Sequence, residues 1–248
     1  MIGGQGTRDR GNKGPREQGA KKTRQAGLGK LLTRSFFEHR PELVAPRLLG
    51  KLLVHRTRAG LLAGRIVETE AYLGPHNDPI DTAAHSNRGP TPRNLVLFGH
   101  PGHAYVYSIY GRYFCMNVSC ETKGQAGCVL IRALEPVAGL KQMARNRGLD
   151  WTSALTARLA PQLTSGPSRL CDAMAIVRTS HDGLDLTDPR SPFQVRDDGF
   201  HVTEAVVTPR IGINTSNSAV DWPLRYAIPG HPCVSGPRSL SGKRIFIS

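Results

Sequence analysis

Hydrophobic and polar residues alternate with the two-residue period of a β-strand in two parts of the chain. In the first part, residues 61–72 end in Ile-Val-Glu-Thr-Glu-Ala-Tyr, which places Glu68 and Glu70 on the same side of a regular strand. Residues 51–56 have the same strand-like character and precede a turn at Ala59-Gly60. Two such segments around a short turn predict an antiparallel pair.

The second part, residues 103–119, is the strongest hairpin pattern in the chain. Tyr105 and Tyr107 share one face, Tyr110 and Gly111 form the tip, and residues 113–118 return. One interpretation of the tyrosines is an aromatic sheet core. Tyr110 favours another interpretation, because an aromatic at a turn beside Arg112 can insert between stacked bases of a nucleic acid.

The other segments mix helical and strand patterns. We expect helices at residues 41–49, 137–147, 151–159 (stopped by Pro161) and 168–176, and strands at 127–134, 193–195, 200–207, 210–213 and 224–228. A polar loop of about twenty residues, 74–94, lies between the first two strand regions, and loops of that length inside a domain are usually functional.

The composition points to an anionic partner. The 248 residues carry a formal net charge of +14, and 39% of them are hydrophobic, enough for a sizeable core. Such a charge predicts a polyanion, most simply nucleic acid. Residues 1–35 hold nine Lys or Arg against two Asp or Glu, half of the excess. We therefore expect residues 1–28 to be a disordered basic tail, which either solubilises the chain or contacts nucleic acid.

Cysteine spacing and hydropathy indicate the compartment. The five cysteines are scattered and lack the spacing of a zinc site, which favours reduced thiols in a cytoplasmic protein. The polar N-terminus has no apolar signal-peptide core, and no run approaches the roughly 20 apolar residues of a membrane span. We expect a cytoplasmic protein, nucleoid-associated if bacterial, without membrane contact.

Several side chains are candidates for chemistry. Glu68 and Glu70 either form a solvated strand face or place one carboxylate in a cleft. Arg132, in an apolar run, needs a carboxylate or phosphate partner because an unpaired buried charge is prohibitive. Loop and helix-start donors suit phosphates, although ordinary capping is the more common role of a helix start; these donors are Arg88, Thr91, Arg93 and Ser168.

Six blocks in one order carry a family resemblance. They are IVETEAYLG, AAHS, TPRN, YVYxIYGxYFCMN, CVLIRALEP and SGPSRLC. Together they resemble the alkyladenine (3-methyladenine) DNA glycosylase family. The resemblance implies a mixed α/β (α+β) fold: a single compact domain over residues 29–248, with a curved antiparallel sheet, surrounding helices and a protruding β-hairpin.

The resemblance also implies roles for individual residues. Glu70 would activate a water for attack on the C1′ of a flipped nucleotide, with Arg132 and the Ile211 carbonyl holding that water. The base pocket would comprise Tyr72, His85, Tyr107 and Asn117, and Tyr110 would insert into the duplex. Contacts to the DNA backbone are expected from Arg88, Thr91, Arg93, Arg112 and Ser168.

The implied activity is excision of alkylated or deaminated purines from double-stranded DNA by a monomer without cofactor, metal or strand cleavage. Two features depart from the family pattern: Arg112 replaces an apolar residue, and the loop after Tyr72 is longer around residues 76–79. Two alternatives remain open. One is a non-catalytic nucleic-acid-binding module, and the other is a metal-dependent hydrolase that uses Glu68, Glu70 and His85.

Overall fold

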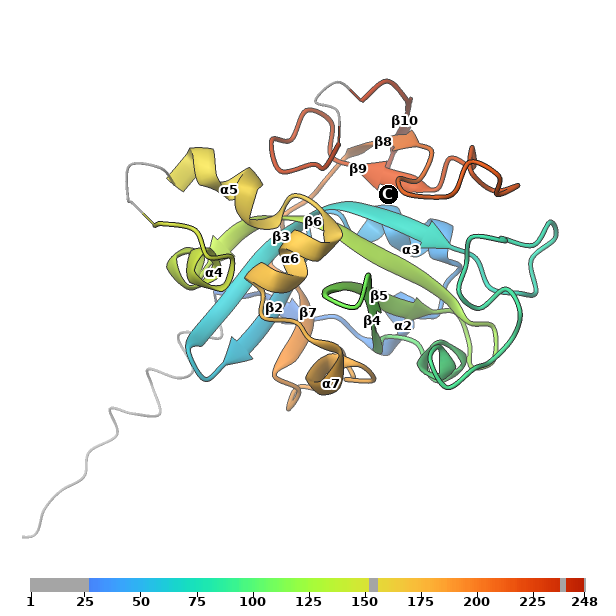
Figure 1. Cartoon of the computed structure of the whole chain (residues 1–248), viewed down its shortest axis with the longest axis horizontal. Helices are drawn as coiled ribbons and strands as arrows, with labels where there is room; N and C mark the ends of the chain where they lie inside the picture. The colour runs from blue at the N-terminus through green and yellow to red at the C-terminus, as the bar shows by residue number, and fades with distance from the viewer. Residues whose placement is uncertain (1–26, 152–155, 237–239, 248) are drawn as a thin grey trace, which may run out of the picture.

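The strands form one antiparallel sheet. The computed structural model describes residues 27–151, 156–236 and 240–247, and within them the sheet has ten strands. Their bounds are β1 Lys30–Leu31, β2 Leu52–Thr57, β3 Gly60–Tyr72, β4 Ala104–Ile109, β5 Tyr113–Cys120, β6 Gly127–Ala138, β7 Phe193–Asp197, β8 Glu204–Thr208, β9 Arg225–Ala227 and β10 Lys243–Phe246. Seven follow the order β1-β7-β2-β3-β6-β5-β4, and a branch of β9, β8 and β10 joins β3 (Figure 1).

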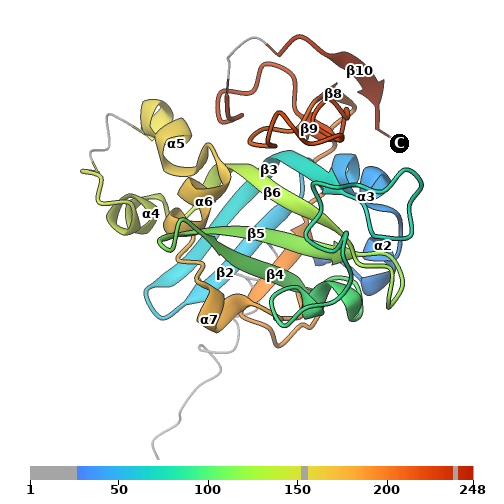
Figure 2. The ribbon, with the colours of Figure 1, turned by 45° about the vertical axis from the view of Figure 1, so that its right-hand side comes forward.

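Short helices surround this sheet. They are α2 Arg34–Phe37, α3 Pro41–Leu48, the 3-10 helix η1 Leu95–Phe98, α4 Leu140–Asn146, α5 Thr156–Thr164, α6 Pro167–Ala173 and α7 Arg178–His181. In both views α4, α5 and α6 group at one end of the sheet, and α2 and α3 lie at the other (Figures 1 and 2). The mixed α/β fold with a mostly antiparallel sheet confirms the expected class. Within the described residues, no helix is both long and apolar enough to cross a membrane.

Strand β3 is the centre of the architecture. It is connected to β2 by the turn predicted at Ala59-Gly60 and pairs with that strand. It also pairs with β6 on its other side and with β9 at residues 68–70. Its ladder with β6 shifts register on both sides of Glu68. The predicted hairpin is also present, because β4 and β5 pair from Ala104 with Val118 to Ile109 with Tyr113.

Three element predictions need correction. Residues 137 and 138 continue β6, and α4 begins only after Gly139, whose φ of 78° turns the chain. Pro161 lies inside α5 rather than ending a helix, since Ser165 N still bonds to the Pro161 carbonyl at 3.1 Å. Residues 210–213 form no strand but a bend that follows β8.

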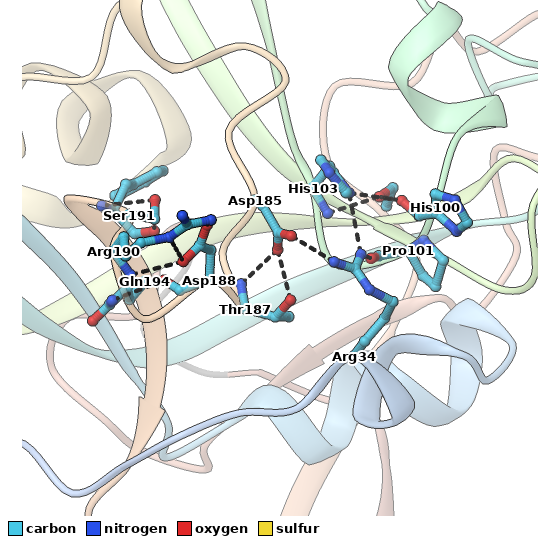
Figure 3. Close-up of polar contacts among 12 residues, drawn as sticks. Arg34, His100, Pro101, His103, Asp185, Thr187, Asp188, Arg190, Ser191 and Gln194 are labelled. Carbon is cyan, nitrogen blue, oxygen red and sulfur yellow. Dashed lines mark hydrogen bonds and ion pairs between the residues drawn. The ribbon is translucent and has the colours of Figure 1, made fainter.

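One arginine of helix α2 forms an ion pair and a hydrogen bond with segments near the start of the hairpin. Arg34, in α2, donates to Asp185 Oδ2 and to the Pro101 carbonyl, both at 2.5 Å (Figure 3). The Asp185 carboxylate also accepts a hydrogen bond from the Thr187 amide at 2.8 Å. The backbone of Asp185 forms an isolated antiparallel β-bridge with His103, which precedes β4. The predicted tail, residues 1–28, lies outside the described residues except for its last two, and Leu28 is buried against Leu52 and Val54.

Candidate active site

Glu70 lies near the end of β3 and is fully buried. Its Oε1 accepts the Ile211 amide at 2.7 Å and lies 3.2 Å from Arg132 Nη1, while its Oε2 accepts the Tyr72 hydroxyl at 3.0 Å. The carboxylate is therefore held by one cation and two neutral donors. The Ile211 amide that contacts it brings the residue expected to hold the water next to the carboxylate.

Glu68 is also fully buried, so the interpretation of a solvated strand face is wrong. Its Oε1 accepts Arg132 Nε at 2.9 Å, Arg225 Nε at 2.7 Å and the Ser235 hydroxyl at 2.9 Å, and its Oε2 accepts the Ser235 amide at 2.7 Å. Four donors on one carboxylate balance the cost of burying its charge. The register shifts around Glu68 place it and Glu70 on the same arginine.

Arg132, on β6, has the carboxylate partners that its apolar surroundings predicted. Burial alone would lower the pKa of this guanidinium, but the carboxylates of Glu70 and Glu68 outweigh burial and raise the pKa above its usual value. Arg132 therefore stays charged beside Glu70.

A pocket of about 250 Å³ lies next to this cluster. It is smaller than the roughly 300–1,000 Å³ of sites for drug-sized ligands, so its size suits one small planar ring system. Tyr72, His85, Tyr107 and Asn117 all line it, so the four predicted pocket residues are brought together from three strands and the loop 74–94. Further lining residues are Ala83, Arg93, Tyr105, Ile109, Cys128, Gly212 and Ile213.

The histidine and the tyrosines of the pocket are uncharged near neutral pH. Burial, and then the charge of Arg93, lowers the pKa of His85 to about 4, so its imidazole is neutral. Its Nδ1 lies 2.9 Å from the Tyr105 hydroxyl, and its ring packs edge-on to Tyr107 at 4.6 Å between centroids. Burial raises the pKa of Tyr105 to about 12 and also raises the pKa of Tyr107 and Tyr72, so these phenols remain protonated.

The tip of the hairpin projects into solvent. Tyr110 is 94% exposed and has a φ of +51°, so its ring is not part of an aromatic core. Arg112 lies beside it with its guanidinium carbon 5.3 Å from the ring centroid of Tyr113. Tyr105, by contrast, is buried, which confirms the core interpretation for that tyrosine alone.

Comparisons with known proteins identify the family of the chain. A family model described as "Methylpurine-DNA glycosylase (MPG)" matches residues 35–232, which is most of the chain. The chain belongs to the methylpurine-DNA glycosylase family. It is therefore a DNA glycosylase of DNA repair, and the resemblance drawn from the six sequence blocks is confirmed.

Curated relatives match this glycosylase over nearly their full length. A protein of Koribacter versatilis is 51% identical over 209 residues, covering 84% of this chain and 95% of its own. A protein of Alkaliphilus oremlandii is 45% identical over 206 residues, covering 82% and 98%. Both carry the name "Putative 3-methyladenine DNA glycosylase".

A buried ion pair that the sequence did not predict lies behind the pocket of this glycosylase. Arg210 Nη1 and Nη2 donate to the two carboxylate oxygens of Asp81 at 2.6 and 2.8 Å, and both side chains are fully buried. The Arg210 guanidinium carbon also lies 4.6 Å from the ring centroid of Tyr72. Asp81 belongs to the loop 74–94 and Arg210 precedes Ile211, so this pair joins two segments that form the site. The two residues are separated by 129 positions in the sequence, so no local pattern predicts the pair.

The residues predicted to contact the DNA backbone lie at separate places. Arg88, Thr91 and Arg112 are exposed, and Ser168 is half-buried in the first turn of α6. Thr91 directs its hydroxyl to Asn94 Oδ1 at 3.0 Å, within its own loop. Arg93 is exposed but also lines the pocket.

The metal-hydrolase alternative has no geometric support in the part of the chain that the structure describes. No three His, Cys, Asp or Glu side chains gather there in a metal-binding arrangement. Glu68, which that alternative required as a ligand, instead binds two arginines.

Proposed function

We propose that this glycosylase removes damaged purines from double-stranded DNA by hydrolysis and leaves an abasic site. The observation that carries the proposal is the buried carboxylate of Glu70, linked through the Tyr72 hydroxyl to a small aromatic pocket. The names of the relatives add 3-methyladenine to the candidate substrates. One chain supplies every group of the site, so we propose that it acts as a monomer.

Extrusion of the nucleotide is the first step of this proposal. A base inside a duplex is stacked and paired, so it must leave the helix at a cost of roughly a few kcal/mol before an enzyme reaches its glycosidic bond. Tyr110, which is almost fully exposed at the hairpin tip, would fill the gap and offset part of that cost. Arg88, Thr91, Arg112 and Ser168 would hold the flanking phosphates.

The pocket would then bind the extruded base. Tyr72 and Tyr107 would stack on it, a contact worth about 1–3 kcal/mol per base and tolerant of different purines. The neutral His85 would bind the edge at position six, and with its Nδ1 beside Tyr105 its Nε2 is the nitrogen left for the base. Asn117, buried at the pocket wall, would crowd the 2-amino group of a normal guanine.

Hydrolysis would use one water. Glu70 takes a proton from this water, and Arg132 and the Ile211 carbonyl hold the water in place. The water oxygen bonds to C1′ while the glycosidic bond breaks and its electron pair leaves with the base. Arg132 Nη1 lies 3.2 Å from Glu70 Oε1, so a cation faces the carboxylate that would act as the base. The residues that line the pocket include no lysine, so we expect no covalent intermediate and no strand cleavage.

An excision assay tests this proposal. Duplex oligonucleotides that carry hypoxanthine, ethenoadenine or a methylated purine are incubated with the full chain and heated in alkali, which breaks DNA at abasic sites. We expect breaks at the lesion only after alkali. Salt-dependent binding to every duplex without any break would instead identify a non-catalytic nucleic-acid-binding module. Breaks without alkali would contradict simple hydrolysis.

A further inference from the structure

Arg93 is the one formally charged side chain among the described residues that line the base pocket. Its guanidinium carbon lies 5.3 Å from the ring centroid of Tyr107, one of the two proposed stacking walls. The residue is exposed, yet, besides the larger effect of burial, its charge lowers the pKa of His85 and of Tyr105, so the cation acts on groups that line the pocket.

The charged groups beside Glu70 and behind Tyr72 are balanced. Arg132 and Arg225 face Glu68 and Glu70, so this cluster has two cations and two carboxylates. Arg210, behind Tyr72, is paired with Asp81.

Arg93, by contrast, forms no ion pair with any side chain in the described ranges. His85 is neutral and adds no charge. The walls of the pocket therefore carry one net positive charge, and Arg93 supplies it.

We propose that Arg93 selects uncharged purines over cationic ones, because its guanidinium stabilises the negative charge that an uncharged purine gains as it leaves. This inference rests on the proposed excision reaction. It concerns the class of damaged base, such as deaminated or etheno purines as opposed to ring-methylated cationic purines.

The two reactions differ in the charge that the departing base carries. When the glycosidic bond of an uncharged purine breaks, the ring receives the electron pair and leaves as an anion, which then takes a proton from water. A purine nucleotide methylated at N3 or N7 starts as a cation, and its base leaves neutral. In both reactions the attacking water gives its oxygen to C1′ and its proton to Glu70. A fixed cation beside the ring therefore favours the first transition state and repels the second substrate when it binds.

The test compares two lesions in one duplex sequence, hypoxanthine as the uncharged base and 7-methylguanine as the cationic one. Single-turnover excision rates of both are measured for the wild type and for Arg93→Gln. We expect the ratio of the hypoxanthine rate to the 7-methylguanine rate to fall about tenfold, less than the loss of a fully buried oxyanion donor because Arg93 is exposed. Arg93→Lys, which keeps the charge, should restore most of the ratio.

Arg112 provides a matched control. Its guanidinium also lies 5.3 Å from a tyrosine ring centroid, but on Tyr113 at the hairpin and outside the pocket. Arg112→Gln should change both rates by the same factor and leave their ratio unchanged. An equal fall on both lesions for Arg93→Gln, with a smaller dependence of binding on salt, would mean that Arg93 only contacts a phosphate and would overturn the inference. A wild type that excises neither lesion would instead overturn the proposed function.

Discussion

Glu68 determines where Arg132 points, and through Arg132 it influences Glu70. The carboxylate of Glu68 bonds to Arg132 Nε at 2.9 Å, which leaves Nη1 to face Glu70 at 3.2 Å. Arg225 and Ser235 hold Glu68 from the opposite side. The proposed general base is thus supported by a buried network in which each carboxylate oxygen of Glu68 has a donor.

Glu68→Gln should damage both the fold and the reaction. The amide would leave two arginines with one carboxylate, and breaking a buried ion pair costs about 3–5 kcal/mol. A misplaced Arg132 should also slow excision by about 10²-fold. Urea unfolding and single-turnover excision measure the two effects.

Glu135→Gln is the matched control. Glu135 lies on the neighbouring strand with its side chain 44% exposed and 3.8 Å from Arg65, so its loss should cost less than about 1 kcal/mol. If the two substitutions had equal effects, Glu68 would have no special role in holding Arg132.

At the residue scale the sequence predicted one ion-pair partnership of the site but not the network around it. The burial of Arg132 in an apolar run predicts a carboxylate partner, and Glu68 and Glu70 two positions apart are evident candidates. The bulged register of β3 could not be predicted, because it depends on pairing with β6, a strand that is distant in the sequence. The donors Arg225 and Ser235 lie even farther away, 157 and 167 positions from Glu68.

At the scale of elements, local patterns succeeded where the turn residues agree with the pattern. The hairpin β4–β5 has period-two alternation up to a turn at Tyr110 and Gly111, both with positive φ, and glycine adopts that conformation readily. The helix expected at residues 137–147 is present as α4, but its expected start at residue 137 was wrong because β3 is long enough to pair with residues up to Ala138. Tertiary pairing there overrides the local helical pattern.

One contact between elements should make stability depend on pH. His55 of β2 and His181 of α7 face each other with their Nε2 atoms 3.2 Å apart, and both rings are buried. Burial lowers the pKa of both below 6.5, and for His55 the facing His181 lowers it further. The unfolded chain then binds protons more readily than the folded one, so stability is present above about pH 6.5 and is lost as the pH falls below it.

Urea unfolding at pH 7.5, 6.0 and 5.0 measures this dependence. The wild type should lose up to about 1.4 kcal/mol per pH unit for each histidine that titrates. The double variant His55→Gln, His181→Gln should have a smaller loss, whereas His39→Gln, at an exposed site, should behave as the wild type. An unchanged slope in the double variant would show that other groups cause the dependence.

At the scale of the whole molecule, the sheet order gathers distant segments around one site. Strands β3, β4, β5 and β6 and the segment after β8 all contribute residues to the pocket or to the cluster beside it. The family resemblance predicted that the four pocket residues from these segments lie together. Composition and periodicity alone predicted only a basic α/β protein with an anionic partner.

Because the net charge is +14, we expect many basic side chains across the surface to contribute to the affinity for DNA. We expect the logarithm of the binding constant to fall linearly with the logarithm of salt concentration. Arg112→Gln should reduce that slope by about 1 if Arg112 binds a phosphate. Arg190→Gln is the control, because Arg190 is already paired with Asp188 at 2.9 Å and should leave the slope unchanged (Figure 3). Equal slopes for both variants and the wild type would exclude Arg112 from the interface.

The most direct test of the proposed reaction uses the variant Glu70→Gln and a duplex that contains hypoxanthine. Binding is measured by gel shift, and base release is measured under single-turnover conditions. We expect the variant to bind the lesion duplex about as well as the wild type and to release the base about 10²–10⁴-fold more slowly, because the amide cannot accept the proton of the attacking water. Release at the wild-type rate would contradict the role of Glu70 as the base that activates water.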